Sequence, residues 1–169
     1  MAISTEYSHV QRALEFFNKN SIYFAIGKSS PWADDNSPPA PDPNDTTLQE
    51  LIGYKKVETI HMVVPDEQNG TILYRDVKWR IVSPDQAFQE KAKWVYIETY
   101  IRYDELPLGY YRQVGVFTGL QPASGVPAGK FNLLPEEVEN PGVLEIIDNR
   151  GPSNRLPDQK EKLSLVIEF

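Results

Sequence analysis

Apolar residues near the start of the chain recur at helical spacing. Four of them lie three or four positions apart, which is the spacing of one helix face. Ser4 or Thr5 can cap this helix, and Glu6 falls in its first turn, where the helix dipole favours a negative charge. The pattern predicts a helix over residues 4–18, with an inward stripe formed by Tyr7, Val10, Leu14 and Phe17.

Most of the remaining chain shows the alternation of apolar and polar residues that is typical of β-strands. The first strand is a continuous apolar run over residues 22–26, which Gly27 ends. The last is the clean alternation over residues 163–169. Between them, strands are expected near 57–64, 77–81, 95–103, 110–118 and 143–147, so the total is six or seven.

A second, shorter helix is expected to begin at Asp45 or Thr46 and to end near Gly53. Strands that follow one another, with helices set apart from them, favour a mainly β fold. We therefore predict a single domain over residues 1–169, a β-sandwich-like core with an N-terminal helix and a second short helix.

Residues 29–45 differ from the rest of the chain. They hold five prolines and four aspartates, and proline both fixes φ and removes a hydrogen-bond donor. Such a stretch cannot form a helix or an inner strand. We expect a stiff, extended, acidic arm within the domain.

Trp32 lies inside this proline-rich arm, remote in sequence from any predicted strand. Two interpretations are open: the indole folds back onto the sheet, or it inserts into a neighbouring subunit. A large rigid ring buries much area at little entropic cost, and this favours tryptophan at interfaces.

The formal net charge of −7 argues against binding to phosphate backbones and to anionic membranes. The chain has no cysteine, which excludes disulfides, thiolate metal sites and cysteine nucleophiles. No signal peptide or membrane span is recognisable, so synthesis in the cytoplasm is expected, with no nucleic acid or membrane as partner.

Residues for catalysis are few. His9 and His61 are the only histidines, and neither has a second histidine at ligand spacing. Acidic pairs in the arm could hold calcium, and Asp104 with Glu105 could in principle act as a glycosidase pair, but neither matches a known spacing. We expect no enzyme activity, no catalytic or metal-binding residues and no cofactor.

Two segments resemble virion structural proteins of tailed bacteriophages. Residues 23–39 (YFAIGKSSPWADDNSPP) are similar to an "aromatic, Ile-Gly, Ser/Thr-x-x-Trp, acidic, Pro-Pro" segment of those proteins. Residues 106–117 are similar to their "Arg-Gln-(Val/Ile)-Gly" strand. The family that the chain resembles is the baseplate wedge protein family of contractile-tailed phages.

This resemblance implies a structural subunit of the virion tail or baseplate, part of a symmetric assembly with other tail proteins and copies of itself. The arm is expected to join neighbouring subunits. The residues expected at the interface are Trp32, Pro31, Pro38, Pro39 and Arg112, and Gly27 and Gly115 are expected to serve structural turns.

Two alternatives remain open at this point. A host-surface module could bind glycans through tyrosines and tryptophans, and Trp94 is a candidate for an exposed ring. A subunit of the neck, which connects head and tail, would have the same general composition.

Overall fold

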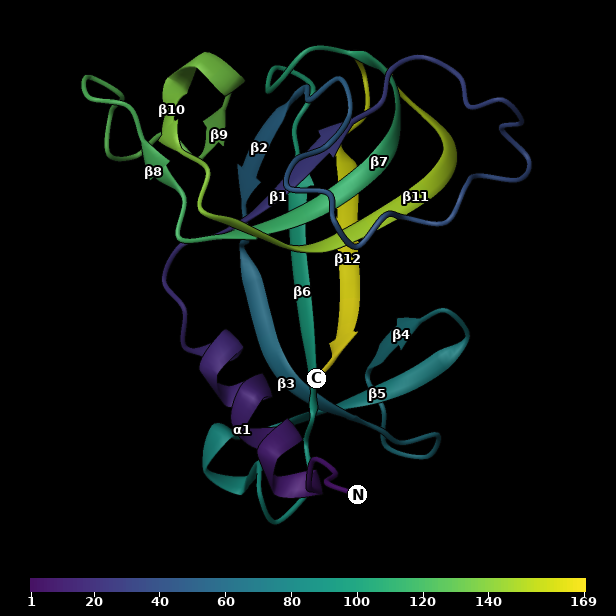
Figure 1. Ribbon diagram of the computed structural model, residues 1–169, viewed down its shortest axis with the longest axis vertical. Coiled ribbons are helices and arrows are strands. Elements are labelled where there is room, and N and C mark those ends of the chain that lie inside the picture. Colours follow the sequence, from purple (N-terminus) through teal and green to yellow (C-terminus); the bar gives the residue numbers. More distant parts are fainter. The chain divides into compact units, whose positions relative to one another are not determined.

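The computed structural model describes residues 1–169, and the chain divides into two compact units. The first unit comprises Met1–Lys19, Glu58–Glu98 and Ser164–Phe169. The second comprises Asn20–Val57 and Thr99–Leu163. The fold is mainly β, as predicted, with a single α-helix (Figure 1).

The first unit contains the helix α1 (Glu6–Phe17) and most of a five-stranded sheet. The strands lie in the order β12-β6-β3-β5-β4. Their bounds are Thr59–Pro65 for β3, Ile72–Tyr74 for β4, Val77–Val82 for β5, Trp94–Ile101 for β6 and Glu161–Glu168 for β12. The short 3-10 helix η1 (Pro84–Gln86) precedes β6.

Helix α1 begins as predicted, because the Thr5 hydroxyl oxygen accepts a hydrogen bond from the Ser8 amide (3.2 Å). The predicted inward stripe is wrong in part. The buried residues are Val10, Ala13 and Phe16, whereas Tyr7 is 60% exposed. Ala13 has almost no side-chain bulk, so this face can approach the unit's core closely.

The second unit is built on a five-stranded sheet in the order β11-β7-β1-β2-β9. The strands are β1 (Ile22–Gly27), β2 (Gly53–Lys56), β7 (Gly109–Thr118), β9 (Asn132–Leu133) and β11 (Val143–Arg155). Two short strands, β8 (Gln121–Pro122) and β10 (Val138–Asn140), pair separately, and the 3-10 helix η2 (Pro135–Glu137) lies between β9 and β10. Every residue of β1 is buried, as its apolar sequence predicted.

The predicted number of strands is wrong, since the chain forms twelve. Four of the missed strands, β4, β8, β9 and β10, have only two or three residues, too few for alternation to be visible. The Asn-Arg-Gly-Pro sequence at residues 149–152 predicts a turn, but these residues lie inside β11, whose register with β7 shifts between Asn149 and Ser153. A single sandwich-like domain stays a prediction.

The predicted second helix is absent, and residues 45–52 form an irregular connection. Their backbone groups bond to other segments instead: the Lys28 amide donates to the Gln49 carbonyl (2.7 Å), and the Ile52 amide donates to the Ile26 carbonyl (2.9 Å). Leu48 is buried in the core cluster with Tyr23 and Phe117. Tertiary contacts therefore override the local helix signals.

Candidate assembly interface

The root of the proline-rich arm is held by Arg112 on β7. Its Nε and Nη2 donate to the two carboxylate oxygens of Asp35, at 2.9 and 3.0 Å. Its Nη1 donates to the carbonyl oxygen of Ser29 at 2.5 Å. The hydrogen bond from Arg112 holds the pKa of Asp35 below its ordinary value. A planar guanidinium fixes direction as well as distance, so this fork orients the arm.

Trp32 folds back onto its own sheet, which is one of the two interpretations that the sequence left open. Its indole Nε1–H donates to the backbone carbonyl of Arg150 (2.8 Å). That carbonyl lies in the irregular part of β11, which is an edge strand. The Trp32 backbone amide donates to the Asp35 carboxylate (2.9 Å). Trp32, Asp35 and Arg112 therefore form one anchor that holds the arm on the sheet.

A second group of contacts surrounds the start of the arm. The Lys28 ammonium lies 5.0 Å from the centroid of the Trp32 ring. Glu50 accepts hydrogen bonds from the hydroxyls of Ser30 (2.7 Å) and Ser29 (3.2 Å). The bond from Ser30 is the main cause of the lowered pKa of Glu50.

The distal part of the arm carries one further tether and is otherwise exposed. The Asn149 side-chain amide donates to the carbonyl of Pro39 (2.9 Å), and Pro38 is half-buried. Pro31 is exposed, as are Pro39 and residues 40–44. The arm is thus fixed along β7 and β11, while four of its five prolines are exposed.

The two glycines expected at turns serve close packing instead. A Cβ at Gly27 would lie 2.6 Å from the carbonyl oxygen of Gln49, and the turn residue is Lys28, with a φ of 60°. Gly115 lies within β7, where a Cβ would come within 2.9 Å of the side chains of Leu144 and Leu48. Because neither glycine has a side chain, the segment around Leu48 has room to pack against the core at both positions.

The other candidates for chemistry take structural positions. Glu105 accepts two hydrogen bonds from the buried Lys55 (both 2.8 Å). Burial raises the pKa of Glu105, but the bonds from Lys55 and from the Arg102 amide outweigh burial and lower it below its ordinary value. No group of three or more histidine, aspartate or glutamate side chains is placed to hold a metal ion. No helix is long and apolar enough to cross a membrane.

The tryptophans of the first unit pack against each other. The rings of Trp79 and Trp94 lie 5.8 Å apart, Trp79 is 8% exposed and Trp94 is half-buried. The half-burial of Trp94 leaves little ring surface for sugar stacking.

Arg155 was missed by sequence reasoning. It is 3% exposed, and its Nη1 and Nη2 donate to backbone carbonyls of Arg102, Glu105, Leu106 and Pro107. These bonds hold the connection between β6 and β7. No local signal marked this residue, because it follows a predicted turn and its acceptors lie about fifty positions earlier in the chain.

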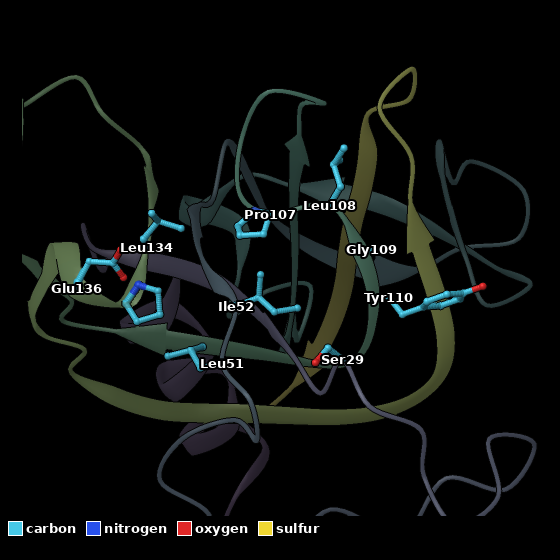
Figure 2. Close-up of a pocket in the computed structure, with 10 residues that line it drawn as sticks. Ser29, Leu51, Ile52, Pro107, Leu108, Gly109, Tyr110, Leu134 and Glu136 are labelled. Carbon is cyan, nitrogen blue, oxygen red and sulfur yellow. The ribbon is translucent and has the colours of Figure 1, made fainter.

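A groove opens beside the start of the arm (Figure 2). Ser29 is one of its lining residues, and Leu51, Ile52, Leu108 and Leu134 supply apolar surface. In the view of Figure 2, Glu136 and Tyr110 lie on opposite sides of this groove.

The comparisons with known proteins specify the class to which this mainly β chain belongs. The model of the family "Baseplate wedge 3 tail fiber network component" matches residues 1–169. The chain is 40% identical over 176 residues to Virion protein 3 of Enterococcus phage phiEF24C, an alignment that covers 99% of this chain and 96% of that protein. The class is thus that of bacteriophage virion proteins associated with the baseplate.

Within that class, the chain belongs to the baseplate wedge 3 tail fiber network component family. The predicted resemblance to baseplate wedge proteins is confirmed.

Proposed function

We propose that this chain is a non-enzymatic connector that joins neighbouring subunits of the baseplate through residues 29–45. The observation that carries this proposal is the fork between Arg112 and Asp35, which fixes the arm on the chain's own sheet. An arm that is already ordered loses little conformational entropy when it binds a partner. The interface residues are then the outward ones, Pro31, Pro39 and residues 40–44.

Trp32 and Arg112 take a different role from the one that the sequence suggested. Both are engaged within the chain, so they position the arm instead of contacting the neighbour directly. Pro38, which is half-buried, marks the boundary between the anchored and the outward parts. Other tail and baseplate proteins, or further copies of this chain, are the proposed partners.

The test replaces Pro39, Pro41 and Pro43 with glycine and leaves the anchor untouched. We expect an unchanged β circular-dichroism spectrum of the isolated chain and loss of co-assembly with the other baseplate proteins, because the flexible arm must be ordered on binding. A matched control carries Pro127 and Pro157 replaced with glycine in exposed connections far along the chain from the arm. Normal co-assembly of the arm variant would reject the proposal.

A further inference from the structure

We propose that the groove beside β7 binds an extended segment of another virion protein, which adds as a strand to β7 and carries an apolar side chain next to a lysine or arginine. The inference deepens the proposed function, since the partner is a component of the same assembly. It concerns a surface of the second unit at which the arm contributes only its first residue, Ser29.

The first support is an incomplete strand ladder. On one side, β7 pairs with β11 down to the pair of Gly109 with Arg155. On the other side, its pairing with β1 stops at the pair of Gln113 with Gly27. Gly109, Tyr110 and Tyr111 therefore have a strand partner on one side only, and the accessible part of this edge is Gly109 and Tyr110, because Tyr111 is buried. A backbone edge of this kind accepts an added strand.

The edge is held open by the fold. The chain leaves the sheet at Lys28, whose φ is 60° and whose amide donates to the Gln49 carbonyl. The bond from Arg112 to the Ser29 carbonyl then keeps the departing arm in place. The chain therefore does not continue β1 alongside residues 109–112 at the start of β7.

The second support is the apolar lining next to this edge. Leu51 and Ile52 come from the connection before β2, and Leu134 comes from the turn before η2. Leu108 and Tyr110, at 45% and 51% exposure, lie on the β7 side. In strand addition, the backbone bonds provide affinity and such side-chain pockets provide specificity.

The third support is charge. Glu136 is the one charged side chain that lines the groove, it is exposed, and it has no ion pair or hydrogen bond within the chain. A lysine or arginine in the bound segment complements it. The arm of a second copy is a poor occupant, because residues 29–45 carry four aspartates and no basic residue.

The experiment uses assembled particles that carry the photoreactive residue p-benzoylphenylalanine in place of Leu108. After irradiation, we expect an adduct with a segment of another virion protein that holds an apolar residue within a few positions of a lysine or arginine. Adding Glu136→Lys should lower the adduct yield by about fivefold or more, the size of effect expected when one partly exposed charge pair becomes repulsive. Glu139→Lys, an equal charge change at an exposed position outside the groove, should leave the yield unchanged.

Three outcomes would overturn the inference: an adduct between two copies of this chain, no adduct, or a yield that Glu136→Lys does not lower. The same photoreactive residue in place of Tyr110 replaces the first probe if the Leu108 variant does not fold. A third particle preparation, with the probe in place of the exposed Ser124, separates the two proposals. If the Ser124 variant is absent from particles, the proposed structural role is contradicted. If the Ser124 variant is present but the probe at Leu108 or Tyr110 gives no adduct, only the groove proposal is contradicted.

Discussion

The guanidinium of Arg112 and the carboxylate of Asp35, 77 positions apart in the chain, form two parallel hydrogen bonds of 2.9 and 3.0 Å. The side chain of Arg112 is 6% exposed and that of Asp35 is 28% exposed, so solvent reaches only the acidic partner freely. This pair connects the proline-rich arm to the central part of the sheet in the second unit.

Replacing Arg112 with lysine keeps the charge but removes the fork and its bond to the Ser29 carbonyl. We expect amide hydrogen exchange in residues 29–45 to accelerate by about tenfold, the effect of losing one charge-assisted bond. Hydrogen-exchange mass spectrometry measures this. Arg12→Lys, in an exposed position of α1, is the control and should change nothing in the arm. Unaltered exchange in the Arg112 variant would show that the fork does not hold the arm.

The anchor should respond to acid. The pKa of Asp35 lies below its ordinary value of 3.8 when the arm is anchored. The contribution of the ionised carboxylate is therefore complete above pH 3.8 and is lost as the pH falls through the lowered value. The Nε1–H resonance of Trp32 should shift over this range in a proton NMR titration.

Asp35→Asn should abolish this acid transition, because an amide does not titrate. Glu50 also has a lowered pKa and touches the same segment, so Glu50→Gln serves as the comparison and should keep the Trp32 transition. The same transition in wild type and in the Asp35 variant would assign it to another group.

Gly27→Ala should destabilise the chain by about 1–3 kcal/mol, the usual cost of overpacking, because the new Cβ would meet the Gln49 carbonyl oxygen. Gly129→Ala is the matched control, since a Cβ there meets nothing within 4 Å. Its free energy of unfolding should stay equal or rise slightly. Urea unfolding of both variants checks the prediction, and equal midpoints would refute it.

Arg155→Lys should cost about 3 kcal/mol, because the guanidinium is buried and several part-buried backbone carbonyls lose their donor at once. Protection from amide hydrogen exchange should fall first in residues 102–108, because the Arg155 guanidinium bonds to the carbonyls of this connection. Arg150→Lys, a half-exposed arginine of the same strand, provides the comparison. If Arg155→Lys and Arg150→Lys lose the same amount of stability, the hydrogen bonds from Arg155 to the backbone carbonyls are not the cause.

Much of the fold follows from local patterns. The alternation over residues 163–169 predicts β12, whose Leu163, Leu165 and Ile167 are buried. The unbroken apolar run before Gly27 predicts a strand buried on both faces. These patterns indicate which residues are buried, because the apolar or polar character of each residue is visible in the sequence of the strand itself.

The candidate interface was predictable only in part. The prolines mark residues 29–45 as extended, because each fixes its own φ whatever surrounds it. The place where the arm attaches was not predictable, since the sequence favours a solvated acidic loop at Asp35, with a calcium ligand as the alternative, and nothing near Asp35 indicates its ion pair with Arg112. The choice depends on which residue of β7 lies beside it.

The sequence by itself determined the mainly β class, the capped N-terminal helix, the stiff arm and the resemblance to baseplate proteins, because each of these depends on residues that are neighbours in the chain. Only the tertiary structure decided that residues 45–52 are not helical, that Trp32 bonds to Arg150, and that the start of β7 has no partner on its β1 side, beside a groove. Those outcomes depend on contacts between distant segments, whose energies outweigh local preferences and leave no periodic pattern in the chain.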